Sequence, residues 1–362
     1  MKTKILLFLF LFLTLSLSLA IADTLPTPLP DYQPRFGRTQ PVVAVVADNE
    51  MTELTDFVVP YAVLKASGAA QVLSVATGSG VVNLYPALKM QAETTMAGFD
   101  HTYPQGADYV IVPALHNVQA AVLQNWVRAQ TAKGAIIVGI CDGVWVLAHA
   151  GLLEQRRAVG FWYSMDGLQK QFPNTTWVRN QRYLADGKII TTTGVTASLP
   201  ASLALVASIA GHERATALAN ELGIKNYLST HDSQQFKMSF VHATTIAGNW
   251  LRFWSHEEIA LPLSAGINDI ALALYADAWS RTYRSQVKTY ASSMQAVKSR
   301  YGLQLLPDAV ADATGMDRIK KEHNWLTEIA PARAMDQALQ EIGKAYGLAT
   351  RAMVSAFMEY PQ

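Results

Sequence analysis

The sequence contains one cysteine, Cys141, and its neighbours give the thiol a candidate chemical role. An apolar run from Ala135 to Ile140 precedes it, and Gly143 opens an apolar helical stretch after it. This pattern predicts a sharp strand-to-helix turn that pushes the cysteine side chain out of the sheet. Backbone N–H groups and the helix dipole at such a turn favour a thiolate and can hold a developing oxyanion. The alternatives are a buried, inert thiol and an intermolecular disulfide.

The segment from Gly139 to Trp162, GICDGVWVLAHAGLLEQRRAVGFW, resembles the cysteine elbow of the DJ-1/PfpI family. It is most similar to the amidase-like domain of GlxA-type regulators and to the isocyanide hydratases, and the resemblance covers roughly residues 42–223. It implies an α/β fold with a flavodoxin-like, doubly wound parallel sheet. It also implies that an acidic residue four positions before a proline hydrogen-bonds the cysteine. Asp56, four residues before Pro60, occupies that position and would act as general acid or base.

Three positions depart from the family pattern. Asp142 stands where a small or hydroxyl residue usually follows the cysteine, and its carboxylate would raise the pKa of a sulfur that it faced. Pro113-Ala114-Leu115-His116 replaces a Gly-Gly pair that often supplies an oxyanion amide, and Phe161 replaces a histidine before Trp162.

A candidate site follows from these positions. Backbone amides of Asp142 and of Ala114 or Leu115 would hold negative charge. His116 could reach the pocket from its loop, although a polar loop residue is the simpler interpretation. The candidate catalytic residues are Cys141, Asp56 and Asp142, and the candidate pocket residues are Ala114, Leu115, His116, Gly143 and Trp162.

The elements around these residues alternate between strands and helices, which argues for a parallel sheet covered on both faces. Gly68 and Gly134 follow helical patterns, and Asp186-Gly187 is typical of a hairpin turn. The predicted domain spans residues 42–225. Its strands are expected at 42–47, 70–76, 109–112 and 135–140, its helices at 54–67, 118–133, from 143 and at 199–211, and its hairpin at 176–193.

The first residues predict export. Lys2 and Lys4 precede an apolar stretch, and Ala20-Ile21-Ala22 fits a signal-peptide cleavage site, so residues 1–22 are expected to be removed. Retention of this segment as a membrane anchor is the alternative. Five prolines in residues 23–41 indicate an extended arm. The predicted location is therefore the periplasm or the extracellular space.

Charge and composition limit the partners. Without its two N-terminal lysines the chain has 27 basic and 28 acidic residues, which offers no electrostatic footprint for nucleic acid. His231, His242 and His256 lack the regular spacing of metal ligands, so we predict no metal or cofactor. The expected partner is a small-molecule substrate or ligand, contact with a membrane is expected only through an uncleaved signal segment, and the sequence leaves a homodimer open.

Residues 226–362 are expected to form a mainly helical second region. A shift of 217 residues places 42–62 over 259–279, and a shift of 136 places 198–211 over 334–347, including Gly211 over Gly347. The two shifts differ, so a second copy would lack the cysteine elbow. The region would then be a truncated, non-catalytic repeat. The alternative is the chance similarity of any two amphipathic α/β segments.

The sequence therefore predicts a cysteine-dependent hydrolase or hydratase in which Cys141 attacks an electrophilic carbon and Asp56 manages the proton. A protein that only binds a ligand or a partner is the main alternative, and chaperone or stress-protective behaviour is a third. GlxA-type regulators carry a basic DNA-binding module after this domain. The near-neutral residues 226–362 and the export signal argue against that function here.

Overall fold

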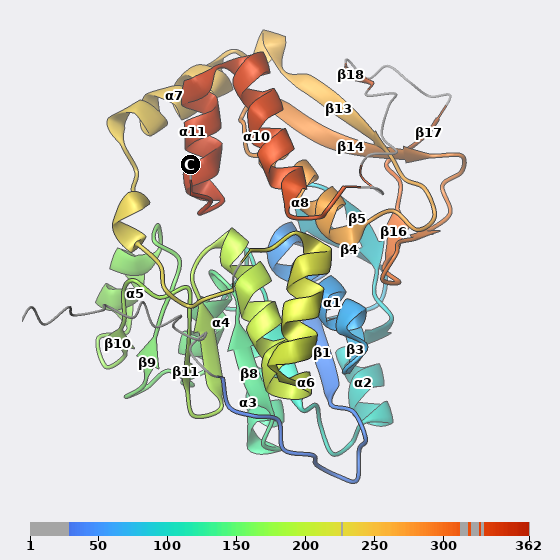
Figure 1. The fold of residues 1–362 in the computed structure, drawn as a ribbon, viewed down its shortest axis with the longest axis vertical. Helices are drawn as coiled ribbons and strands as arrows, with labels where there is room; N and C mark the ends of the chain where they lie inside the picture. The colour runs from blue at the N-terminus through green and yellow to red at the C-terminus, as the bar shows by residue number, and fades with distance from the viewer. Residues whose placement is uncertain (1–28, 226, 312–317, 320–325, 327–328, 362) are drawn as a thin grey trace, which may run out of the picture.

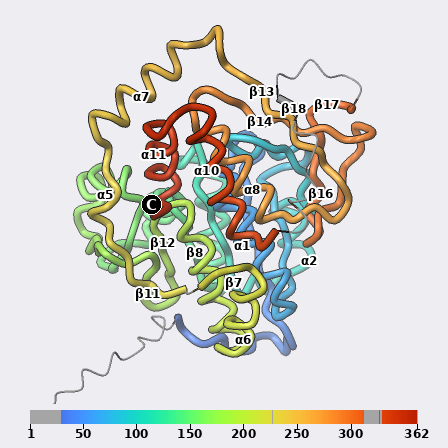
Figure 2. The backbone as a smooth tube through the Cα atoms, turned by 45° about the horizontal axis from the view of Figure 1, so that its top comes forward, coloured from blue at the N-terminus to red at the C-terminus, as the bar shows by residue number. Residues whose placement is uncertain are grey.

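The computed structural model describes residues 29–225, 227–311, 318–319, 326 and 329–361. The predicted signal segment and the first part of the proline-rich arm lie outside these residues. The remainder of the arm packs on the first half of the chain, where the Tyr32 N–H donates to the Ser208 carbonyl at 3.0 Å. Figure 1 shows the second half stacked on the first, and α7 (Phe240–Leu251) lies at the edge of the second half in Figures 1 and 2.

A seven-stranded sheet forms the centre of the first half. Its strands are β1 (Val42–Ala47), β3 (Gln71–Ala76), β6 (Thr94–Thr95), β7 (Tyr109–Val112), β8 (Ile136–Gly139), β11 (Tyr183–Asp186) and β12 (Ile189–Thr192). Their order is β11-β12-β8-β7-β1-β3-β6; β11 pairs antiparallel with β12, and the other pairs are parallel. This arrangement confirms the predicted doubly wound parallel sheet, and it gathers the carboxyl ends of β1, β7 and β8 at one edge.

Helices cover both faces of this sheet, as the strand sequences require. All six residues of β1 are buried; Val43, Val45 and Ala47 face one core, and the residues between them face the other. The first core contains α1 (Leu54–Ser67) and α6 (Ser198–Leu222). The second contains α2 (Met96–Thr102), α3 (Ala121–Ala132) and α4 (Gly143–His149).

Most of the predicted elements are present. β1, β7 and α1 have the predicted bounds, and α1 ends at Gly68 with a φ of 66°. The hairpin is shorter than predicted, because β10 (Thr176–Trp177) pairs with β9 (Arg157–Ala158) instead. The sequence analysis missed β2 (Thr52–Glu53), the β4–β5 hairpin (Val81–Tyr85 and Lys89–Gln91), α2, α5 (Met165–Gln171) and the short helices η1 (Val195–Ala197), η2 (Ser233–Gln235) and η3 (Phe253–Ser255).

The second half is helix-rich, as predicted, but it also contains a parallel sheet. The α-helices that the structure describes there are α7, α8 (Asp269–Ser280), α10 (Arg333–Tyr346) and α11 (Leu348–Phe357). The sheet has the order β17-β14-β13-β18, formed by Ala309–Val310, Ser285–Ala291, Glu257–Pro262 and Arg318–Ile319. β13 begins with two charged residues, and in β14 buried positions alternate with exposed or half-buried ones. Neither strand therefore has the continuous apolar sequence that is typical of a buried parallel strand.

The second half repeats the element order of the first. Each of β13, α8, β16 (Gln304–Leu306) and β17 begins 215 residues after its counterpart, β1, α1, β5 or β6. The shift of 217 inferred from the sequence is wrong by two residues, because the charged start of β13 reads as loop. In the first half the Ser74 N–H donates to Glu93 at 2.7 Å; at the equivalent positions the Thr289 N–H donates to Asp308 at 2.9 Å.

The last helices also correspond, at the shift of 136 found in the sequence. Gly211 kinks α6 with φ 85° and ψ 160°, and Gly347 separates α10 from α11 with φ 88° and ψ 164°. Between β7 and the last helices the first half has residues 113–197, whereas the second half has residues 320–332 after β18. A segment that short cannot hold a counterpart of the α3–β8–α4 unit, so the second half has no cysteine elbow.

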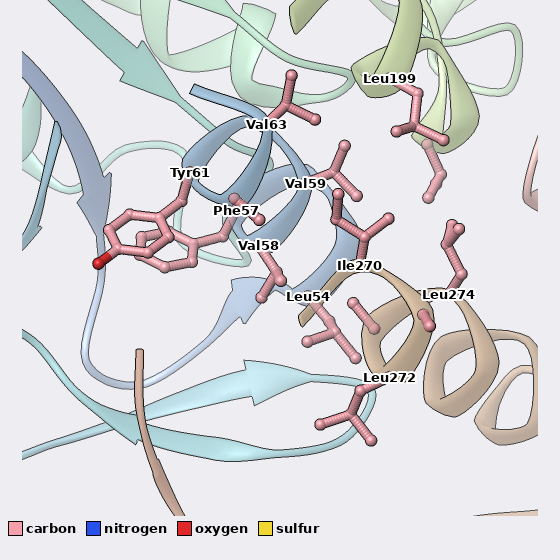
Figure 3. Close-up of a cluster of buried hydrophobic side chains, with 14 of the residues drawn as sticks. Leu54, Phe57, Val58, Val59, Tyr61, Val63, Leu199, Ile270, Leu272 and Leu274 are labelled. Atoms are coloured by element: carbon pink, nitrogen blue, oxygen red, sulfur yellow. The ribbon is translucent and has the colours of Figure 1, made fainter. Parts of the chain in front are cut away.

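The two halves pack through equivalent surfaces. β5 pairs antiparallel with β16, and Met90 lies opposite Leu305, its counterpart at the shift of 215. This pairing extends the sheet β15-β16-β5-β4-β2, in which β15 is Val297–Lys298. α1 packs against α8, its own counterpart, and also against α6, as Figure 3 shows for side chains around Leu54 and Ile270. The contact therefore has the self-complementary character of a two-fold interface.

Candidate active site

Cys141 lies on the turn between β8 and α4, as the sequence predicts. Its φ of 54° falls in the left-handed region, which non-glycine residues seldom adopt. Such a backbone persists only where the surrounding structure holds it, and it is common at active sites. Gly143 permits the tight turn, because a Cβ at this position would lie 2.1 Å from the Val112 carbonyl oxygen. The strand-to-helix elbow is therefore present.

The Cys141 thiol is buried and neutral at rest. The residue is 4% exposed, and its N–H donates to the Thr192 hydroxyl at 3.1 Å. Burial raises the pKa of the thiol well above its ordinary value; Asp56, Asp142 and Glu53 raise it further, whereas a hydrogen bond from the Asp142 backbone lowers it. The elbow alone would favour a thiolate. The structure corrects this expectation, because desolvation and three neighbouring acids raise the pKa of the thiol more than one backbone hydrogen bond lowers it.

Asp56 lies in the first turn of α1 and is fully buried. Its Oδ2 accepts a hydrogen bond from the Ala114 N–H at 3.3 Å, and burial raises the pKa of the carboxyl to about 8. Asp56 is therefore protonated at neutral pH. Its Oδ1 has no hydrogen-bond partner among the described residues, so the direct bond to Cys141 implied by the family resemblance is not formed there. The carboxyl keeps a proton that it can donate to an incoming molecule.

Two of the predicted amides have different environments. The Ala114 N–H is used by Asp56, and the Ala114 carbonyl accepts from the Glu53 N–H at 2.9 Å. Leu115 lies opposite Thr52 in an isolated antiparallel β-bridge. The backbone N–H of Leu115 makes no hydrogen bond to another described residue. Leu115 is thus the better candidate for an oxyanion donor.

The other predicted residues are placed as follows. The carboxyl of Asp142 is buried, which raises its pKa, while hydrogen bonds from Ser164 and Trp145 act in the opposite direction. His116 is exposed, and its backbone N–H donates to the Met51 carbonyl, which fits the simpler interpretation of a polar loop residue. The Trp162 indole N–H donates to the Ala356 carbonyl at 3.0 Å, so the second half holds this ring.

A charged network that the sequence analysis missed connects the site to the second half. Glu53 caps α1 by accepting the Asp56 N–H at 2.6 Å, and its other oxygen accepts from the Arg281 guanidinium at 2.5 Å. Arg281 also donates to Asp277 at 2.5 Å, and Asp277 accepts from the Thr55 hydroxyl at 2.7 Å. Burial, followed by the proximity of the Asp56 carboxyl, raises the pKa of Glu53 well above its ordinary value.

One signal of this network was present in the sequence. Asp277 and Arg281 form an i, i+4 pair at the end of a largely apolar helix, and a charged pair at the end of a largely buried helix needs further partners. The identity of the partner could not be read from local pattern, because Glu53 lies 228 residues away.

A cleft of about 550 Å³, lined by residues of both halves, lies beside Arg281. The volume is typical of small-molecule sites. Arg281 lines the cleft and also contacts Glu53, so it connects the cleft to the acids around the thiol. Cys141 itself is not among the lining residues. Aromatic rings from both halves form much of the wall: Tyr85, Phe161, Tyr163, Trp250, Tyr283 and Phe357.

The sequence profile of the DJ-1/PfpI family matches residues 41–208. Among curated relatives, the HTH-type transcriptional regulator CdhR of Pseudomonas aeruginosa is 32% identical over 125 residues, which cover 34% of this chain and 37% of the regulator. Protein DJ-1 homolog A of Arabidopsis thaliana is 27% identical over 233 residues, which cover 62% of this chain and 55% of that protein. The chain thus spans less than two thirds of each of these relatives.

Two solved structures align with about half of this chain. A DJ-1 superfamily protein from Salmonella typhimurium superposes with a TM-score of 0.45 at 23% identity, over 51% of this chain and 99% of that chain. DJ-1beta from Drosophila melanogaster gives a TM-score of 0.46 at 20% identity, over 51% and 98%. The profile match includes the elbow at Cys141 and the acid at Asp56. Residues 41–208 of this chain are a DJ-1/PfpI family domain.

Proposed function

We propose that this chain is an exported, cysteine-dependent hydrolase or hydratase that acts on a small molecule. One observation carries the proposal: a cysteine held at a strained elbow lies beside a buried acid that is protonated at neutral pH. Strain at a cysteine and a strongly shifted pKa on its neighbour are features that cluster at catalytic sites. Export to the periplasm or outside the cell is part of the proposal and is supported by the N-terminal segment alone.

The resting protonation states suit a proton relay. As the Cys141 sulfur forms a bond to an electrophilic carbon, electrons of the breaking π bond move to the substrate's heteroatom. Asp56 gives its proton to that heteroatom or to the leaving group and takes the thiol proton, so its own charge is unchanged. The amides of Asp142 and Leu115 are the donors proposed for the developing charge. Water then attacks the carbon and restores the thiol.

A panel of activated esters, amides and isocyanides tests this proposal. The wild-type protein is expected to turn over at least one class and to carry the corresponding mass adduct on Cys141. Cys141→Ser should lose the adduct. Asp56→Asn should retain a free thiol but lose about 100-fold or more in turnover, which is the usual contribution of a general acid or base. Asp166→Asn, an exposed carboxyl in α5, is the matched control.

Two results would contradict the proposal. Turnover that survives Cys141→Ser would exclude the thiol as nucleophile. A thiol that titrates like an ordinary cysteine, with a reactivity unchanged in Asp56→Ala, would show that the pair does not act together.

A binding protein without catalysis is the second candidate, and the burial of Cys141 away from the cleft favours it. Binding to the native state raises the melting temperature and needs no nucleophile. Metabolites that stabilise wild type and Cys141→Ser equally, with no turnover of any of them, would support this candidate over the enzyme.

A further inference from the structure

Two arginines on the wall of the cleft have donors without acceptors. The Nε of Arg284 is buried and has no hydrogen-bond partner among the described residues. Arg281 uses Nε for Asp277 and Nη2 for Glu53, and none of the hydrogen bonds between described residues involves its Nη1. A buried guanidinium N–H ordinarily finds an acceptor, because leaving it without a hydrogen bond is destabilising. The buried Nε of Arg284 therefore indicates an acceptor that arrives with a ligand, and Nη1 of Arg281 is a second donor for that acceptor.

The remaining lining defines the shape and charge of that ligand. The aromatic side chains come from both halves, and Tyr163 and Trp250 are 60% and 64% exposed. Exposed rings facing a cleft offer stacking surfaces for a flat molecule. Two acids also line the cleft; the Glu257 carboxylate accepts from the Tyr346 hydroxyl at 2.6 Å, and Glu258 is exposed.

We propose that the cleft between the halves binds a planar aromatic carboxylate, with its ring on the aromatic wall and its carboxylate on Arg281 and Arg284. Arg284 can bind a carboxylate in the plane of its guanidinium through two parallel hydrogen bonds, which a neutral amide cannot reproduce, and Arg281 can add one hydrogen bond from Nη1. Arg281 also donates to Glu53. A carboxylate bound to Arg281 therefore changes the electrostatic environment of the acids next to the thiol. The site goes beyond the proposed thiol chemistry, because binding requires no nucleophile.

Calorimetric titration of the full chain with indole-3-acetate and with its neutral amide tests the site. The acid is expected to bind at least about tenfold more tightly than the amide, because only the acid forms charge-assisted hydrogen bonds. Arg284→Met should remove this preference while leaving the fold intact, since it deletes an unmet buried donor. Arg252→Met, an exposed arginine just after α7, is the matched control and should keep the preference.

Tyr163→Ala should weaken both probes together, because it removes a stacking surface and no charge. Cys141→Ser should bind like wild type, which separates this site from the catalytic proposal. Equal affinity for acid and amide, an acid preference that survives Arg284→Met, or no binding of either probe at millimolar concentration would each overturn the proposal.

Discussion

At the scale of single residues, Asp142 is the clearest departure of this site from its family. Its charge raises the pKa of Cys141, so Asp142→Asn should lower that pKa and shift the pH profile of alkylation to lower pH. The rate of modification by iodoacetamide, followed by mass spectrometry from pH 6 to pH 10, measures this shift. Asp166→Asn removes the charge of an exposed carboxylate that does not act on the pKa of Cys141, and it should leave the profile in place. An unshifted profile in Asp142→Asn would mean that its carboxylate does not act on the sulfur.

Asp56 should also leave a signature in the pH dependence of stability. Its pKa is about 8 in the folded protein and near 4 in an unfolded chain, so the unfolded state releases the proton first as pH rises. The stability contributed by the protonated group is complete below about pH 4 and is lost as pH rises to about 8. Asp56→Asn is therefore expected to gain free energy of unfolding relative to wild type between pH 5 and pH 8. Urea unfolding at both pH values measures the difference, and a constant difference would contradict the shifted pKa.

At the scale of elements, the elbow depends on the contact between α4 and the end of β7. Gly143→Ala would place a methyl group 2.1 Å from the Val112 carbonyl oxygen, and we expect a loss of about 3 kcal/mol or more in the free energy of unfolding. Gly248→Ala in α7 is the control, because no atom lies within 4 Å of the added Cβ. It should be neutral or stabilising by about 0.5–1 kcal/mol. A Gly143→Ala variant as stable as Gly248→Ala would show that the elbow is not tightly packed.

The elements that could be predicted from the sequence are those whose pattern is local. β1 and α1 were found to the residue, because an apolar strand and a helix stopped by Gly68 are visible without tertiary context. β14 was missed, since its side chains alternate between buried and exposed within a helix-rich region. The pair of Cys141 and Asp56 could be found through the family resemblance. Arg281 could not, because its place near the site depends on how the two halves pack.

At the scale of the whole molecule, the second half acts as a partner subunit would. Its α8 packs against α1, its β16 pairs with β5, and it contributes Asp277 and Arg281 to the network around Glu53. Twelve of the fourteen residues of α1 are buried, far more than a helix covering one sheet face requires. A helix that is apolar on all sides must be packed against other elements on both sides. The second half packs against the outer side of α1. The truncated repeat therefore completes the site although it lacks a cysteine of its own.

The equivalence of the two contact surfaces makes a prediction about the first half alone. A chain ending at Gly223 loses the cover of α1 and the partner of β5. The lost partners are equivalent to α1 and β5 themselves, so a second copy can replace them in the same register. We expect the shortened protein to form a two-fold dimer in analytical ultracentrifugation. Met90→Lys should dissociate this dimer, because it sets two like charges directly opposite each other. In the full chain Met90 is fully buried opposite Leu305, so the same lysine is expected to destabilise the full chain as well. A folded monomer that leaves α1 uncovered would contradict the two-fold relation between the halves.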